Sequence, residues 1–178
     1  MASKIKVDTL ETADGSGSIT LNNPIAGDGS GLTGVGKVLQ VVSKSGSSIG
    51  RTTISTSGSW QSANDFNLAI TPSSSSSKIL VTFCIPVRVA GATTPLRGGL
   101  RLLRDTSSVW NTDGFGEHIH VRNADNEHDS LLTVVHLDSP NTTSAVNYNA
   151  QGKLLTGTLL ILFEGTKGAS ITLMEVAG

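Results

Sequence analysis

Charged side chains, cysteine and aromatic residues are all scarce in this chain of 178 residues. Charged residues make up 15% of the sequence and the formal net charge is −1, so electrostatics gives no reason to expect nucleic acid or an anionic membrane as a partner. The one cysteine, Cys84, excludes an intrachain disulfide. It lies within an apolar run, which predicts a buried and unreactive thiol.

Long apolar runs and catalytic motifs are missing as well. The N-terminus has no apolar signal-peptide region, and no apolar run approaches the ~20 residues of a membrane span. We therefore expect a soluble protein that is made in a cytoplasm and does not insert into a membrane. No nucleophile elbow occurs, and few aromatic residues are available to line a glycan-cleaving groove. We predict that the protein is not an enzyme.

Short β-strand patterns fill most of the chain instead. Ser and Thr supply 43 of the 178 residues, and polar turn residues separate short apolar or alternating segments from residue 37 onward. The longest alternation covers residues 79–89, and no segment keeps a 3.6-residue period. These patterns predict an all-β head, residues 37–178, built as an antiparallel β-sandwich or jelly roll.

Three segments of the head support finer expectations about strand position. Residues 131–137 and 159–163 are apolar on both faces, which favours either central strands that are covered on both sides or an intersubunit surface. Pro86 lacks an N–H group, which favours an edge position or a bulge for its strand.

The first 36 residues contain strand-like fragments and glycine-rich turns but too few apolar residues for a core. Such a segment either stays disordered or pairs with another chain. We predict that residues 1–36 are an attachment segment, since three copies winding together or docking on a partner would satisfy its backbone groups. The residues expected to make these contacts are Ile5, Val7, Ile19, Leu21 and Leu32.

A His-x-His pattern at His118 and His120 is the one candidate metal site. Residues i and i+2 share a face of a strand, so both imidazoles can point at one ion. Three chains around a threefold axis would supply six nitrogens, a set suited to a divalent transition metal. The alternative is a solvated loop with no metal, and we expect no other cofactor.

Residues 105–130 are richer in charge and aromatic side chains than the rest of the chain. A long polar loop on a rigid β scaffold is where recognition residues usually lie, and a sugar would stack on Trp110. A hairpin that covers the end of the head is the alternative. The predicted receptor-binding residues are Trp110, Asp113, Phe115, Arg122, Asp125 and Glu127.

Six segments, taken together and in order, resemble small tail-fibre and fibre-like structural proteins of bacteriophages, notably cyanophages. They are residues 3–12 (SKIKVDTLET), 27–35 (GDGSGLTGV), 38–42, 70–74 together with 78–81, 137–145 (LDSPNTTSA) and 171–176 (ITLMEV). The resemblance spreads over most of the chain and fades between residues 90 and 130. The chain has no long repetitive shaft, which leaves open whether it is a receptor-binding fibre or a small collar component.

The resemblance implies a homotrimer on the surface of a virion. Residues 1–36 would contact another tail or baseplate protein, and the β head would face outward for adhesion to the host surface, including its glycans. Two other functions stay open at this point. One is an architectural capsid or tail decoration protein without receptor binding, and the other is a carbohydrate-binding module.

Overall fold

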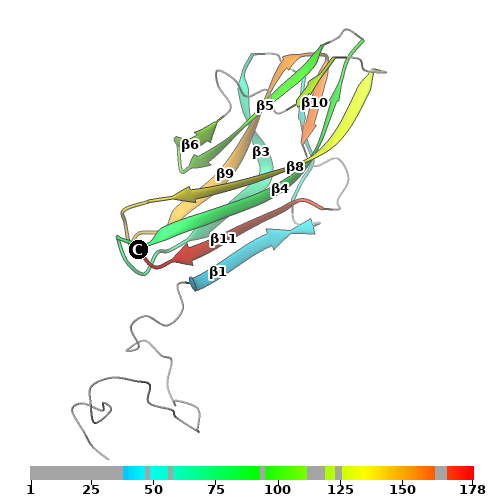
Figure 1. Ribbon diagram of the computed structural model, residues 1–178. Coiled ribbons are helices and arrows are strands. Elements are labelled where there is room, and N and C mark those ends of the chain that lie inside the picture. The colour runs from blue at the N-terminus through cyan, green and yellow to red at the C-terminus, as the bar shows by residue number, and fades with distance from the viewer. Residues whose placement is uncertain are drawn as a thin grey trace, which may run out of the picture. The chain divides into compact units, whose positions relative to one another are not determined.

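The computed structural model describes residues 38–46, 49–55, 58–92, 95–111, 119–122, 126–162 and 168–178. These residues form antiparallel strands that make two sheets, which we call sheet A and sheet B (Figure 1). The predicted all-β, antiparallel architecture is confirmed. The predicted attachment segment lies outside the described residues.

Sheet A is organised around β4 (Lys78–Ala90), its longest strand. One side of β4 pairs first with β11 (Ser170–Val176) and then with β10 (Leu159–Leu162), while the other side pairs with β8 (Glu127–Asp138). Two further strands complete the sheet: β1 (Val38–Ser45) beside β11, and β2 (Thr52–Ile54) beside β10.

Sheet B has the order β3 (Trp60–Ile70), β9 (Val146–Thr156), β5 (Leu96–Arg104) and β6 (Ser107–Asn111). A short strand, β7 (Ile119–Val121), pairs with the start of β5 on the same side as β6. The register of β3 against β9 shifts between Ser62 and Asn67, which marks a large bulge in β3.

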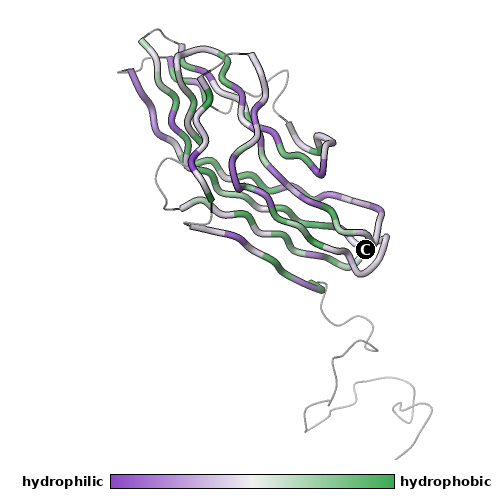
Figure 2. Tube along the Cα trace, turned by 180° about the vertical axis from the view of Figure 1, so that it is seen from behind, coloured by the Kyte–Doolittle hydropathy of each residue, from purple (hydrophilic) through white to green (hydrophobic). Residues whose placement is uncertain are grey.

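The two sheets pack face to face around one hydrophobic cluster with members from both. The alternation over residues 79–89 faces inward, as predicted, and every apolar residue of that set is at most 1% exposed. Phe83 of β4 meets Phe66 of β3 edge to face, with ring centroids 5.8 Å apart. The alternation of hydrophobic and polar residues along these strands is visible in Figure 2.

A buried polar group joins the two sheets at one end of the core. The Tyr148 hydroxyl of β9 donates a hydrogen bond to Asp138 Oδ2 of β8 at 2.7 Å. Arg104 of β5 donates to the same oxygen, also at 2.7 Å. Burial raises the pKa of Tyr148, and the hydrogen bond to Asp138 acts in the same direction, so the phenol remains a donor.

A second polar group holds β1 in place. Glu175 of β11 is fully buried, and Gln40 of β1 donates to its Oε2 at 2.6 Å. The backbone N–H and the hydroxyl of Ser73 both donate to Oε1 at 2.7 Å. Burial alone would raise the pKa of Glu175, but the hydrogen bonds outweigh it and lower the pKa to about 2.

Two expectations about strand position are wrong. Residues 131–137 belong to β8, which pairs with β4 alone among the described strands and is therefore an edge strand. Pro86 lies in β4, which is paired on both sides. It falls where the neighbour changes from β11, whose last pair is Ser170 with Cys84, to β10, whose first pair is Leu162 with Val87. The missing N–H is therefore tolerated in a central strand. Residues 159–162 form β10, which pairs on both sides as predicted.

Candidate functional site

The outward face of sheet A carries apolar side chains in register across four strands. Val41 of β1 is opposite Met174 of β11, which is opposite Leu80 of β4, which is opposite Leu137 of β8. Val41 is 53% exposed and Leu137 is 50% exposed. A continuous apolar row therefore crosses this face. We call the outward side chains of β1, β11, β4 and β8 the sheet A face.

Beyond this row the sheet A face continues with hydroxyl, thiol and apolar groups. The next outward positions of β4 are Thr82, Cys84 and Pro86, opposite Val135, Thr133 and Leu131 of β8. Cys84 is partly exposed here, so the expectation of a buried thiol is wrong. All large hydrophobic side chains that are about half exposed or more in the described residues lie on the two edge strands β1 and β8: Val38, Leu39, Val41, Leu131, Val135 and Leu137.

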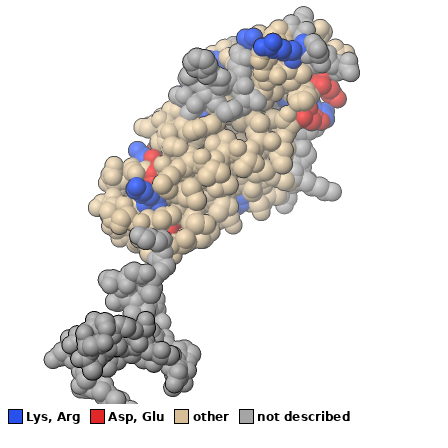
Figure 3. Space-filling model, viewed as in Figure 1, with Lys and Arg blue, Asp and Glu red and all other residues tan. Residues whose placement is uncertain are grey.

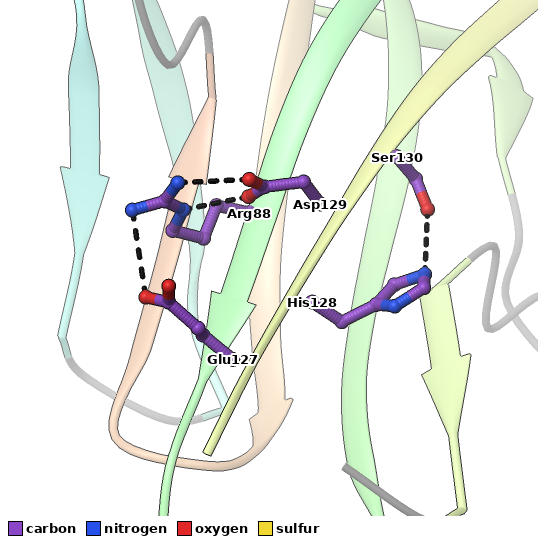
Figure 4. A network of polar contacts seen from close by, with 5 residues as sticks. All are labelled: Arg88, Glu127, His128, Asp129 and Ser130. Carbon is purple, nitrogen blue, oxygen red and sulfur yellow. Dashed lines mark hydrogen bonds and ion pairs between the residues drawn. The ribbon is translucent and has the colours of Figure 1, made fainter. Parts of the chain in front are cut away.

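Charged groups border the sheet A face but do not enter its centre. Figure 3 shows Lys, Arg, Asp and Glu concentrated toward the two ends of the head, with an almost uncharged surface between them. At one end, Arg88 of β4 binds Asp129 of β8 through two hydrogen bonds of 2.6 and 2.8 Å and lies 3.4 Å from Glu127 (Figure 4). The hydrogen bond from Arg88 lowers the pKa of Asp129.

Near Arg88, the inward side of β8 carries a second polar contact, separate from the ion pair on its outward side. In Figure 4, His128 and Ser130 lie on the side of β8 away from Arg88, and their side chains form a 2.9 Å hydrogen bond. A hollow of about 320 Å³ lies beside the ion pair and is lined partly by Pro86 and Leu131. The sheet A face is therefore uncharged in its centre, with a small recess next to its charged border.

The free edge of β8 adds to the exposed apolar surface. This strand has 12 residues, and its second edge pairs with no other described strand. A long, exposed apolar edge strand is a site at which chains aggregate unless something covers it. The exposed charges of β8 that would discourage such pairing lie only in its first part, at Glu127 and Asp129, because Asp138 at its other end is buried.

The expectation of one long polar loop at residues 105–130 is wrong, because this range contains β6, β7 and the start of β8. The predicted receptor-binding residues therefore fall on separate elements. Trp110 of β6 is half-buried and meets Phe83 of the core edge to face at 6.2 Å, so part of its ring is engaged within the head. Arg122 is exposed just after β7, and Glu127 is exposed at the start of β8. The remaining candidates, Asp113, Phe115 and Asp125, lie outside the described residues. Their role in recognition stays a prediction.

The predicted metal site is described only in part. His120 is exposed on β7, opposite Arg97 of β5, and His118 lies outside the described residues. Within the described ranges, no group of three or more His, Cys, Asp or Glu side chains is placed to hold an ion. The His-x-His site therefore stays a prediction.

No protein-family model matches the sequence, and no curated protein matches it either. Among the described residues, no helix is long and apolar enough to cross a bilayer.

From the sequence alone, the apolar residues on both faces of residues 131–137 are compatible with a covered core strand or with an intersubunit surface. The sequence does not show that these residues continue a larger apolar face with β1, β11 and β4. In the folded chain one side, with Val134, packs on the core, whereas Leu131, Val135 and Leu137 point outward. Nothing in the described part of the chain covers them.

Proposed function

We propose that this protein is a structural component of a bacteriophage virion, a short fibre whose β head forms a homotrimer through the sheet A face. Residues 1–36 attach the trimer to the particle, and the head faces the host surface. The sheet A face is the observation that carries this proposal. The resemblance of six segments to phage fibre proteins supplies the biological setting.

The size of the apolar patch supports self-association. Six large side chains, each about half exposed, present roughly 500 Å² of apolar surface per copy, an extent that marks interaction sites on soluble proteins. At ~25 cal/mol per Å², burying this area would contribute about 12 kcal/mol, which is comparable to the ~4–15 kcal/mol cost of association. The rows with Thr82 and Thr133, which follow the apolar row along β4 and β8, would enlarge the contact. The buried area would then approach the ~800 Å² per partner that is typical of stable interfaces.

The distribution of the patch favours a ring of copies. Apolar residues cluster at both edges of one sheet, with Val41 on β1 and Leu137 on β8. A contact in which the β8 edge of one copy meets the β1 side of the next is heterologous, and such contacts form a ring when the rotation between neighbouring copies closes on the first copy. Three copies in such a ring would cover every β8 edge, so this long apolar edge would no longer be open to aggregation.

The strand order supports assigning the head to the jelly-roll class. Sheet A contains β1, β11, β4 and β8, and sheet B contains β3, β9, β5 and β6. The chain crosses between the sheets repeatedly, from β2 to β3, β3 to β4 and β4 to β5, and again around β8 and β9. Crossed connections of this kind are what distinguish jelly rolls from simple meanders.

The assembly is tested by measuring the molar mass of the full chain in solution. We expect about three times the monomer mass of 18.4 kDa. Leu137→Lys places a charge in the apolar row and should shift the protein toward monomer. Ser108→Lys places the same charge on an exposed position of β6 in sheet B and should leave the trimer intact. A wild-type chain that stays monomeric at all concentrations would refute the assembly.

Cys84 provides an independent measure of the same interface. It is the only cysteine and lies on the sheet A face, so assembly should slow its reaction with a maleimide. Leu137→Lys should speed the reaction, whereas Ser108→Lys should not. Adhesion is tested separately by binding of the labelled trimer to host cells. If virions that lack this protein fall apart while the labelled trimer binds no host cells, the protein is an architectural decoration protein instead.

A further inference from the structure

A polar hollow of about 390 Å³ opens on the outward face of sheet B, away from the sheet A face. Its volume is within the ~300–1,000 Å³ range of small-molecule sites. Its base is formed by residues in register on three strands. Asn67 of β3, Asn149 of β9 and Leu103 of β5 make one row, and Ser62, Gln151 and Arg101 make the next.

The bulge in β3 forms one wall of the hollow. The register moves from Ser62 opposite Gln151 to Asn67 opposite Asn149, so β3 advances five residues while β9 advances two. Asp65 takes up the extra length with a φ of 56°, and Lys44 of β1 holds its carbonyl oxygen with a hydrogen bond. A bulge of this kind bends a strand and redirects its side chains.

The turn between β5 and β6 forms the opposite wall. Asp105 adopts a φ of 54° and exchanges two hydrogen bonds with Asn147 of β9. The Asp105 N–H donates to the Asn147 carbonyl at 2.7 Å, and the Asn147 N–H donates to Asp105 Oδ1 at 3.0 Å. Asn149 also donates to the Asp105 carbonyl at 3.3 Å. Both walls are therefore held in place before any ligand arrives.

The side chains around the hollow form a prearranged set of donors and acceptors. Arg101 Nε donates to Gln151 Oε1 at 2.7 Å, and Gln151 Nε2 donates to Ser62 Oγ at 3.1 Å. The Arg101 guanidinium lies 4.7 Å from the centre of the Trp60 ring, which fixes its plane. Within the described ranges, the terminal N–H groups of Arg101 and the side-chain amide of Asn67 have no protein partner.

An apolar floor lies beneath this polar rim. Leu103 is only 6% exposed, yet it does not belong to the core cluster and shares the outward face with Asn149. Ala63 of the bulge lines the same hollow and is also 6% exposed. The rim carries one cation, Arg101, and one carboxylate, Asp105, so its formal charge is zero. A neutral ligand with one apolar face and many hydroxyl groups matches this arrangement.

We propose that the hollow binds a pyranose unit of a neutral glycan. The sugar hydroxyls would exchange hydrogen bonds with the Asn67, Asn149 and Arg101 side chains, while the C–H face of the ring rests on Leu103. This inference deepens the adhesion role in the proposed function and rests on it only for the biological source of the glycan. It also places the sugar site in the hollow on the outward face of sheet B rather than around Trp110, whose ring meets Phe83 of the core.

Saturation-transfer NMR on the full chain tests the proposal directly. The probes are the methyl glycosides of glucose, galactose and mannose, with glucuronic acid and inorganic phosphate as charged competitors. We expect transfer to the ring protons of at least one neutral glycoside. Asn149→Ala and Asn67→Ala should each weaken its binding roughly two- to tenfold, the effect of losing one or two hydrogen bonds. Asn64→Ala is the matched control, because Asn64 is an exposed asparagine of β3 that does not line the hollow.

Three results would overturn the proposal. They are the absence of transfer to all three glycosides, equal binding by the Asn67, Asn149 and Asn64 variants, and displacement of the glycoside by inorganic phosphate. Thermal unfolding of each variant establishes that the fold is retained. The molar mass measured on the same samples separates the two proposals. A trimer that binds no glycoside refutes only the sugar site, and a monomer that binds one refutes only the assembly.

Discussion

Replacing Glu175 with Gln should destabilise the head strongly at neutral pH and only weakly in acid. The carboxylate is fully buried and accepts three hydrogen bonds, one from Gln40 and two from Ser73. Its pKa is lowered from 4.5 to about 2 in the folded protein. The charged form is therefore stabilised by folding, and 2.5 pKa units correspond to about 3 kcal/mol.

The sign of the pH dependence follows from this lowered pKa. The stabilisation is fully present above the unfolded-state pKa of 4.5 and is lost as the pH falls through the folded-state pKa of about 2. Glu175→Gln cannot carry the charge and presents an amide N–H₂ to groups that are themselves donors. The variant should therefore be about 3 kcal/mol less stable at pH 7, and the difference should shrink to ~1 kcal/mol at pH 3.

Urea unfolding of both proteins, followed by tryptophan fluorescence, measures this difference at several pH values. Other carboxylates titrate in both proteins, so their contributions cancel in the comparison. Glu175→Asp serves as a control that keeps the charge but moves it back by one methylene. A stability difference that is the same at pH 7 and pH 3 would refute the hydrogen-bonded carboxylate as the source of the effect.

Two further predictions concern polar contacts within and between the sheets. Tyr148→Phe removes the donor to Asp138 and should cost about 1–3 kcal/mol in urea unfolding. Because Tyr148 is the only tyrosine and its pKa is raised, an absorbance titration of the folded wild type should show no phenolate near pH 10, where an exposed tyrosine would ionise. Asp129→Asn breaks the ion pair with Arg88, but the pair is exposed, so the free energy of unfolding should change by less than ~1 kcal/mol. A larger loss would show that the border of the sheet A face is structurally more important than its exposure indicates.

Local alternation allowed the sequence to determine several of the longer strands and which side of each faces inward, but not the short strands β2, β6 and β7. Residues 79–89 show this best, because a two-residue period specifies one face of a pleated strand without reference to any partner. The same reasoning correctly located β9 and β11 and identified the all-β class. The absence of a disulfide also followed from the sequence alone, because it depends on composition.

Strand neighbours and surface sites were decided by the tertiary structure. A two-sided apolar pattern does not reveal whether the cover comes from the same chain, and β8 proved to be an edge strand with Leu131 and Val135 exposed. Pro86 is tolerated in the centre of sheet A because it lies between the part of β4 that pairs with β11 and the part that pairs with β10. Sequence reasoning did not find the hollow on sheet B, because its rows join residues more than 30 positions apart.

The sequence by itself therefore determined the all-β class, the inward faces of alternating strands such as β4, and the scarcity of charge that leaves the sheet A face apolar. Only the tertiary structure decided which outward residues lie side by side. The physical reason is that side-chain direction along a strand is set by local backbone geometry, whereas the register between strands depends on bulges and turns such as those at Asp65 and Asp105. Both proposed binding surfaces depend on that register.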